Sequence, residues 1–308
     1  MSRLLTVGIT TRNRPESLRA CLASMPVIAP LDPQVIVFDD GSAPPADTQA
    51  ADRPLPVRLI REDAAPGPIV GRNRLVREAE GEFVLLLDDD TRILTLESIG
   101  AAIDVLRADP QVAAVGFAQA EADGRPWPER MQPSSARVPS LVTAYIGFAH
   151  MVRRSAFLQV SGYREALGFY GEEKELCLRL LDAGLHTVYL PDARVAHVPD
   201  PRNRDRRQYL RRVARNDCLN TLYNDPLTRL AWMLPARVAL YFHMRRAWKI
   251  SDPWGGAWLL RDLAARMPAI LRDRRPVSRA TLARWKAIQR GQLTYDAPPL
   301  HPDSAPGR

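Results

Sequence analysis

The sequence predicts an α/β protein with a mostly parallel sheet covered by helices, followed by a basic helical segment. Three observations support this prediction. In the first half, short β-like runs alternate with stretches of helical periodicity, as in successive βαβ units. One of these runs, Phe83–Leu87, is apolar throughout, which is typical of a strand buried on both faces. From Arg206 onward, apolar residues recur at helical spacing among many arginines.

The first part of the chain contains five candidate strands separated by turns or helical stretches. They are Leu4–Ile9, Val35–Phe38, Val57–Ile60, Phe83–Leu87 and Val112–Phe117. Between the first two, "PESLRACLASM" has its apolar residues on one helical face. "GRNRLVREAEG" predicts a second helix, for which Gly81 is the expected C-cap. A third helix is expected from Thr95 to Ala108.

The middle of the chain is less regular. "ADGRPWPERMQPSS" predicts a loop, and "SLVTAYIGFAHMVRR" predicts an extended segment. "SAFLQVSGY" predicts a short helix with Ser155 as its N-cap. "GEEKELCLRLLDAG" predicts a helix with acidic residues in its first turn, and "TVYL" predicts a strand that ends before Pro191.

Composition and charge place the chain among ordinary globular proteins. Of 308 residues, 46% are hydrophobic and 25% charged. Three distant cysteines favour neither a disulfide framework nor a thiolate metal site. The N-terminus lacks a signal-peptide pattern, and no apolar run approaches the roughly 20 residues of a membrane span. We therefore expect a cytoplasmic protein, either free or peripheral at the inner face of the cell membrane.

The positive charge is concentrated near the C-terminus. Residues 200–290 hold 21 Lys and Arg against 7 Asp and Glu, a net +14, whereas the rest holds 22 against 28, a net −6. Such helices, rich in arginine and tryptophan, suggest contact with an anionic membrane surface. A solvated helical cap packed on the α/β domain is the alternative. Because no nucleic-acid-binding motif is present, we do not expect a nucleic-acid partner.

Polar residues follow three of the candidate strands. Thr10 and Arg12 follow the first, Asp39 and Asp40 follow the second, and three aspartates at 88–90 follow the fourth. Open α/β sheets bind ligands at the carboxyl ends of their strands, so these clusters are expected to converge. Adjacent carboxylates repel one another, and a divalent cation would relieve this repulsion. Mg²⁺ or Mn²⁺ in turn predicts a phosphate-bearing substrate, although no P-loop or dinucleotide fingerprint is present.

An ordered set of motifs resembles the family 2 glycosyltransferases, which are inverting enzymes of the Rossmann-like GT-A fold. The resemblance covers roughly residues 4–200. It rests on "VGITTRNRPESLRACLASM", "VIVFDDGS", "GRNRLVREAEGEFVLLLDDDT", "GFAHMVRRSAFLQVSGYRE" and "YGEEKELCLRLLDAGLHTVYLPDARVAH". Within the family, it is strongest to rhamnosyltransferase-like members, which also tend to carry a downstream Arg-Asn pair, here Arg215 and Asn216.

The resemblance implies a role for each site residue. Thr10, Arg12, Asp40 and, less directly, Asp39 would bind the nucleobase. The remaining donor-side contacts would come from Arg72 and Asn73, near the ribose and diphosphate, and from Asp88, on the nucleotide or the metal. The resemblance assigns the metal to Asp90, with Asp88 and His197 assisting. Asp89 is the aspartate expected to tolerate replacement best.

The catalytic base implied by the resemblance lies in "GEEK". Glu173 matches the base position, where the family usually has an aspartate, and Glu172 is the other member of the pair. Such a base takes the proton of the acceptor hydroxyl opposite the leaving diphosphate. The structural alternative for this motif is a set of acids that stabilises a helix N-terminus. The resemblance favours the catalytic interpretation.

The predicted function is transfer of a sugar from a UDP-, dTDP- or GDP-linked donor to a glycan, lipid-linked or small-molecule acceptor, as in the synthesis of cell-envelope polysaccharide. The predicted domains are a catalytic domain at 1–200, a basic helical region at 201–292 and a disordered tail at 293–308. Two alternatives remain open. A sugar nucleotidyltransferase would show a glycine-rich loop after the first strand, which "TTRNRPES" lacks. A non-catalytic binding module would not need the aspartates at 88–90 or the glutamates of "GEEK", so the presence of these residues weighs against this alternative.

Overall fold

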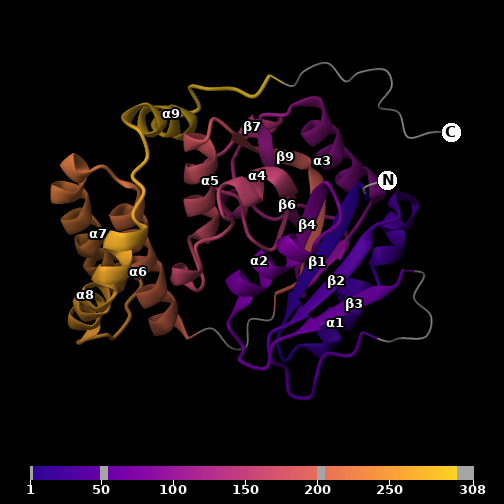
Figure 1. Ribbon diagram of the computed structural model, residues 1–308, viewed down its shortest axis with the longest axis horizontal. Helices are drawn as coiled ribbons and strands as arrows, with labels where there is room; N and C mark the ends of the chain where they lie inside the picture. Colours follow the sequence, from indigo (N-terminus) through magenta and orange to yellow (C-terminus); the bar gives the residue numbers. More distant parts are fainter. Residues whose placement is uncertain (1–2, 49–54, 200–204, 297–308) are drawn as a thin grey trace.

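The central feature of the computed structural model is one sheet with helices on both faces (Figure 1). The structure describes residues 3–48, 55–199 and 205–296. Within these residues the sheet has nine strands, and eight of them follow the order β3-β2-β1-β4-β8-β6-β9-β5. The remaining strand, β7, pairs with β9. The α/β class predicted from the sequence is therefore confirmed.

The predicted strands form the parallel part of the sheet and its continuation. They are β1 (Leu5–Thr11), β2 (Gln34–Asp39), β3 (Val57–Arg61), β4 (Phe83–Asp88) and β6 (Val112–Ala120). β1 lies between β2 and β4 and runs parallel to both. Thr11 pairs with Asp39, and Thr10 pairs with Asp88. The polar residues that end these strands are thereby brought to one edge of the sheet, as expected.

The second part of the sheet contains antiparallel pairs. Its strands are β5 (Thr91–Ile93), β7 (Ser140–Leu141), β8 (Ala149–Arg153) and β9 (His186–His197). β8 lies antiparallel between β4 and β6, and β5 pairs antiparallel with β9. The extended segment expected from "SLVTAYIGFAHMVRR" therefore becomes two strands, β7 and β8.

The strand predicted to end before Pro191 instead continues to His197. Its register with β6 shifts there, because Phe117 pairs with Leu190 but Ala118 pairs with Arg194. Pro191 falls within the resulting bulge, where its missing N–H removes no ladder hydrogen bond. This bulge carries the chain past the proline and onward to His197.

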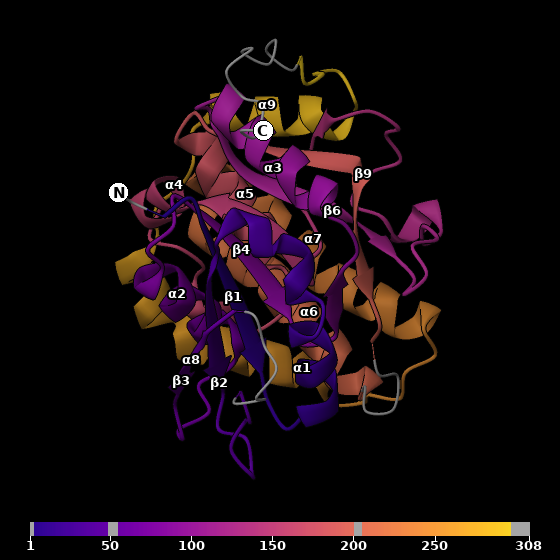
Figure 2. The same ribbon diagram turned by 90° about the vertical axis from the view of Figure 1, so that its right-hand side faces the viewer.

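Helices cover the two faces with separate apolar clusters. One face packs against α1 (Pro15–Leu22), α3 (Leu96–Ala108) and the 3-10 segment Met25–Leu31, which lie in front of the sheet in Figure 2. The other face packs against α2 (Pro68–Glu78), α4 (Arg154–Gln159) and α5 (Glu172–Asp182). Two short 3-10 turns, Glu129–Met131 and Glu165–Leu167, lie in the connecting loops.

Two expected helix caps are not caps. α2 ends at Glu78, three residues before Gly81. Gly81 instead lies against β1, where a Cβ atom would come within 2.5 Å of the Thr6 nitrogen, so glycine is required by close packing. α4 begins at Arg154, and its N-cap Arg153 makes no side-chain capping bond, so the Ser155 assignment is wrong.

The C-terminal region is helical, as predicted, and shares a core with the sheet. Its helices are α6 (Arg206–Asn224), α7 (Leu227–Ala247), α8 (Gly255–Asp273) and α9 (Arg279–Gln289). The apolar cluster that contains Phe38 and Leu176 also contains Leu222, Tyr241 and Trp285. α6, α7 and α8 gather at the end of the molecule away from β1–β3 (Figure 1).

The limits of this helical region lie partly outside the described residues. The expected boundary between residues 200 and 201 falls outside them, as do residues 297–308 of the expected disordered tail. Residues 293–296 of that tail are described, and Tyr295 packs partly buried against the core. In the described part of the chain, none of the helices has the length and apolar character needed to cross a membrane.

Candidate active site

A cavity of about 570 Å³ opens at the carboxyl ends of β1, β2 and β4. Four predicted donor-side residues, Thr10, Arg12, Asp40 and Asp88, line it. Its other polar lining residues are Thr11, Arg14, Asp89, Arg212 and Arg215. Two of these arginines come from α6, so the basic C-terminal region forms one wall of the cavity.

Each of the three aspartates after β4 faces an arginine. Arg72 donates to Asp88 at 2.7 Å. Arg14 donates to Asp89 at 2.8 Å and to Asp90 at 3.0 Å. Two arginines thus supply counter-charge to these acids, so their mutual repulsion does not by itself require the divalent cation that we expected.

Asp89 and Asp90 differ in their electrostatics. Burial raises the pKa of Asp89 to about 6, although Arg14 and the hydroxyl of Thr11, which donates at 2.8 Å, act in the opposite direction. Burial alone would raise the pKa of Asp90 too, but Arg14 and the imidazole of His197 in its protonated form outweigh burial and lower the pKa. Asp89 is thus buried and bonded on both oxygens, which argues against the expectation that it tolerates replacement best.

His197 reaches the aspartates through strand pairing. Its partner in the β5–β9 ladder is Thr91, which directly follows Asp90. The imidazole Nε2 lies 3.5 Å from Asp90 Oδ1. Phe148 and Trp127 stack on the ring, with centroids 4.8 and 5.4 Å away. The imidazole is consequently held in one orientation beside the carboxylate.

The hydrogen bonds around His197 indicate which imidazole nitrogen carries the proton, and therefore whether a cation can bind between His197 and Asp90. The Gln119 amide donates to the Met131 carbonyl, so Gln119 Oε1 is the atom that faces His197 Nδ1, at 2.7 Å. The proton therefore belongs on Nδ1, and Nε2 turns a lone pair toward Asp90 Oδ1. That oxygen has no hydrogen-bond partner. Two facing acceptors of this kind suit a cation between them, as in histidine metal sites with a second-shell acceptor.

No group of three or more His, Cys, Asp or Glu side chains that could hold a metal is found within residues 3–48, 55–199 and 205–296. Mg²⁺ and Mn²⁺ do not require one, because they are commonly held by one or two carboxylates and by substrate phosphates. Asp90 and His197 fit that smaller donor set.

Arg72 joins the cavity to the start of α5. The residue is 1% exposed, and its guanidinium donates to Asp88 at 2.7 Å, to the Gly147 carbonyl at 3.0 Å and to Glu172 at 3.1 Å. Burial alone would lower the pKa of Arg72, but Asp88 and Glu172 outweigh it, so the pKa is raised and the group stays charged. The predicted donor side and Glu172, which directly precedes the predicted base Glu173, thus share one buried cation.

The two glutamates of α5 have different surroundings. Glu172 is fully buried and pairs with Arg72, whereas Glu173 is only half-buried. Glu173 Oε1 lies so near Gly147 that a Cβ atom there would approach it to 2.4 Å. Within the described residues, no other residue donates a hydrogen bond to the Glu173 carboxylate. Burial raises the pKa of both glutamates, and the charge of Glu172 raises that of Glu173 further.

Asn216 fastens the loop that leads into α5. Its amide nitrogen donates to the carbonyls of Leu167, Phe169 and Tyr170 at 3.0, 2.8 and 2.6 Å. Tyr170 and Gly171 have φ of 77° and 81°, a left-handed conformation that costs energy for a tyrosine. These hydrogen bonds therefore hold a strained turn directly before Glu172.

Two more asparagines lie along the same side of α6. Asn220 donates to the Gly171 carbonyl, and Asn224 donates to Glu175, each at 3.3 Å. Positions 216, 220 and 224 recur every four residues, so the three side chains share one helical face. We did not recognise this spacing from the sequence, although the repeated asparagines were a signal for a polar contact along α6.

Besides the buried Arg72, two residues predicted to bind the donor do not line the cavity. Asp39 is fully buried and accepts hydrogen bonds from Ser42, Ala46 and Arg61. Asn73 exchanges hydrogen bonds with the backbone of Tyr163. Both side chains are used to position the loops beside the cavity. The sequence interpretation also overlooked Arg14, although it lies in the quoted "TTRNR" motif.

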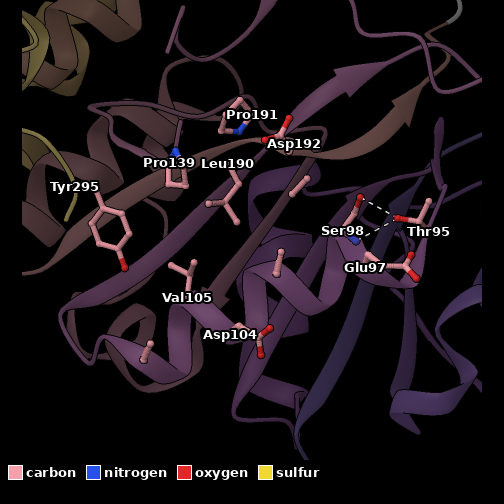
Figure 3. Close-up of a pocket in the computed structure, with 13 residues that line it drawn as sticks. Thr95, Glu97, Ser98, Asp104, Val105, Pro139, Leu190, Pro191, Asp192 and Tyr295 are labelled. Carbon is pink, nitrogen blue, oxygen red and sulfur yellow. Dashed lines mark hydrogen bonds between the residues drawn. The ribbon is translucent and has the colours of Figure 1, made fainter. Parts of the chain in front are cut away.

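A second cavity, of about 460 Å³, shares no lining residue with the first. It lies between α3, β9 and the C-terminal segment, and its wall is mainly apolar (Figure 3). Thr95 and Ser98 on its rim are hydrogen-bonded to each other. The titratable residues of the proposed chemistry are absent from its lining, so we place the candidate site in the first cavity.

Comparison with protein families decides the assignment of the chain. The model of "Glycosyl transferase family 2" matches residues 6–161, which run from β1 to the end of α4. The chain belongs to glycosyl transferase family 2. This match covers the donor-side residues and the three aspartates, while Glu172, Glu173 and His197 lie beyond it.

The curated relatives that the chain matches are distant. A pre-mycofactocin glycosyltransferase of Mycobacterium tuberculosis is 30% identical over 211 residues, which are 63% of this chain and 43% of that protein. An N-acetylglucosaminyl-diphospho-decaprenol L-rhamnosyltransferase of the same species is 28% identical over 240 residues, covering 64% of this chain and 76% of that protein. The chain thus spans less than half the length of the first of these relatives.

Solved glycosyltransferase structures share the fold. GalNAc-T7 with UDP, GalNAc and Mn²⁺ gives a TM-score of 0.58 at 13% identity, covering 86% of this chain and 57% of that chain. A mannosyltransferase of Pyrobaculum calidifontis with GDP-Man and Mn²⁺ gives 0.53 at 14%, covering 92% and 84%. Staphylococcus aureus TarS with UDP-GlcNAc gives 0.53 at 16%, covering 80% and 73%. These likenesses support the expected GT-A fold.

The hydrogen bonds of Asn216 predict a measurable loss of stability on its removal. Asn216→Ala removes the hydrogen bonds to three loop carbonyls, of which that of Leu167 keeps a bond from Arg215, and should lower the free energy of unfolding by about 1–3 kcal/mol. Asn220→Ala is the matched control, because it removes one longer bond one turn away and should cost less than about 1 kcal/mol. Chemical denaturation measures both. Equal losses would contradict the special role of Asn216.

Proposed function

We propose that this family 2 chain is a metal-dependent, inverting glycosyltransferase that uses a nucleotide-diphosphate sugar and a carboxylate base. The observation that carries the proposal is the arrangement around Arg72. One buried guanidinium links Asp88, at the wall of the cavity, to Glu172, which directly precedes the half-buried Glu173. A donor site and a base are thereby held next to each other, as displacement at a sugar carbon requires.

The donor is a UDP-, dTDP- or GDP-linked sugar, with its nucleobase beside Thr10, Arg12 and Asp40. Structural neighbours are described with UDP, UDP-GlcNAc or GDP-Man, which supports this class of donor. The diphosphate lies near Arg212, which lines the cavity and has no ion pair within the described residues. A guanidinium in that position favours negative charge on the leaving group.

Asp90 and His197, assisted by Asp88, are the groups that we propose for a divalent metal. The unpaired Oδ1 of Asp90 and the lone pair of His197 Nε2 support this set. When bound, Mg²⁺ or Mn²⁺ stabilises the charge that develops on the departing diphosphate. Arg14 holds the other oxygen of Asp90 at 3.0 Å and so keeps the carboxylate in place.

Glu173 is the proposed general base. Its carboxylate accepts no hydrogen bond from another described residue, and the residue is partly exposed. Its carboxylate takes the hydroxyl proton as the oxygen attacks the anomeric carbon, and the nucleotide diphosphate leaves from the opposite face. The acceptor class is a glycan or a lipid-linked sugar, consistent with a relative named for a decaprenol-linked acceptor.

Glu173→Gln tests the function directly. Transfer from a nucleotide sugar should fall by about a hundred- to ten-thousand-fold, because a positioned base contributes that much, while donor binding should persist. Sugar transfer and donor binding are measured separately, with UDP-, dTDP- and GDP-sugars as donors. Glu121→Gln, the same change on an exposed loop, is the control. Full activity in Glu173→Gln would refute the assignment.

The raised pKa of Glu173 predicts the pH profile. A base works as its carboxylate, so kcat/KM should rise with pH through this raised pKa and therefore at higher pH than for an ordinary glutamate near about 4.3. Glu172→Gln removes a negative charge that raises the pKa of Glu173, so the acid limb should move to lower pH. An unmoved limb in this variant would contradict the coupling of the two glutamates.

Asp90→Asn tests the proposed metal site without relying on turnover. Mn²⁺ binding in the presence of UDP should weaken about tenfold or more, because a carboxylate ligand becomes a neutral amide. Titration of the Mn²⁺ electron paramagnetic resonance signal measures this. Asp123→Asn, on an exposed loop, should leave the affinity unchanged. Equal Mn²⁺ affinity in Asp90→Asn and the native chain would place the metal elsewhere.

A further inference from the structure

The outward face of α7 is apolar over most of its length. Its exposed positions recur at a spacing of three or four residues, and none of them is charged between residues 227 and 242. They are Leu227, Thr228, Ala231, Trp232, Pro235, Ala236, Ala239 and Phe242. Leu227 is 73% exposed, Trp232 54% and Phe242 45%. Large apolar side chains gathered on one helical face are unusual on a surface that contacts only water.

The apolar surface continues onto α8. Phe242 lies against Gly256, where a Cβ atom would come within 2.8 Å of the ring. Next to it, Trp254 is 77% exposed, and Leu260 and Leu271 farther along α8 are 57% and 67% exposed. We call the exposed side chains of these two helices the α7–α8 face. It comprises Leu227, Trp232, Phe242, Trp254, Leu260 and Leu271, and its helices form the end of the molecule away from β1–β3 (Figure 1).

The two helices that carry this face have an excess of cations. The sequence of α7 contains four arginines and no acidic residue. The two acids of α8 are each paired with an arginine of the same helix at 2.8 Å. Arg246, Lys249 and Arg261 are exposed and form no ion pair within the described residues. The α7–α8 face therefore combines exposed tryptophan and leucine with uncompensated positive charge.

We propose that the α7–α8 face docks on the surface of an anionic lipid bilayer. Apolar side chains that enter the headgroup region and arginines that bind anionic headgroups are together the two signals that stable peripheral attachment needs. Tryptophan prefers that same interfacial depth. The described helices are too short or too polar to span a bilayer, so the helices lie on the surface.

A second copy of this chain is a less suitable occupant. Two copies meeting through the α7–α8 face would bring together two sets of uncompensated cations, and like charges across an interface oppose association. Anionic headgroups offer the opposite charge. Charge complementarity thus favours the bilayer.

Docking at this face also bears on the active site, in a way that rests on the proposed function. α6 packs against both α7 and α8 and supplies Arg212 and Arg215 to the cavity. A bilayer beneath α7 and α8 would therefore lie one helix away from the proposed diphosphate site. An acceptor sugar anchored to a membrane lipid would be reached from that position.

Vesicle flotation with the full chain tests the proposal. The chain should float with vesicles of phosphatidylcholine and phosphatidylglycerol, should float much less with phosphatidylcholine alone, and should be released by high salt. Trp232→Ser/Trp254→Ser should weaken the partition about tenfold or more, because two interfacial anchors are lost. Val138→Ser, at an exposed apolar position of the catalytic domain, should float like the native chain.

A second pair of variants tests the contribution of positive charge to vesicle binding. Arg246→Glu/Arg261→Glu should lose most of the binding to anionic vesicles, whereas Arg77→Glu on α2 should not. Unchanged thermal unfolding shows that each variant is folded. The proposal is overturned if the native chain does not float, if the tryptophan variant floats as well as the native chain, or if the tryptophans instead hold a dimer in size-exclusion chromatography. Donor hydrolysis, measured without vesicles, tests the proposed function independently of this result.

Discussion

The buried guanidinium of Arg72 is the interaction on which the candidate site depends. A cation in a residue that is only 1% exposed is tolerated when its N–H groups have acceptors and its charge is compensated. Asp88 and Glu172 provide both acceptors and negative charge, and the Gly147 carbonyl provides a further acceptor. These partners come from three separate parts of the chain. Removing one member of such a buried pair typically costs about 3–5 kcal/mol, so the end of β4 and the start of α5 are fixed relative to each other.

The parallel part of the fold could be predicted because its signals are local. Each strand is a short apolar run, and polar residues follow it at the edge where βαβ units bind ligands. β9 could not be predicted to its full length, because its passage beyond Pro191 depends on a bulge against β6. Gly81 was read as a cap, since a glycine after a helix has this local meaning, whereas its real constraint is the distant backbone of Thr6.

The site residues that belong to motifs at strand ends could be predicted from the sequence. The contacts between residues far apart in the sequence could not. The sequence singled out all three aspartates at positions 88–90. It could not reveal that Arg72 pairs with Asp88 while Arg14 pairs with Asp89 and Asp90. Residues without a neighbouring motif were missed for the same reason. Gln119, which orients His197, and Asn220 and Asn224 of α6 act through contacts that only the folded chain creates.

The hydrogen bonds from Asn216 to the turn before α5 determine how far toward the C-terminus a fragment must extend to keep the geometry of the candidate site. A chain cut after β9 would keep every strand of the sheet and all the residues matched by the family model. It would nevertheless lose the donor that holds the carbonyls of Leu167, Phe169 and Tyr170. The left-handed turn would then be free to relax and carry Glu173 with it. The smallest fragment that preserves the geometry of the site therefore extends through α6, well past the conventional limit of the sheet.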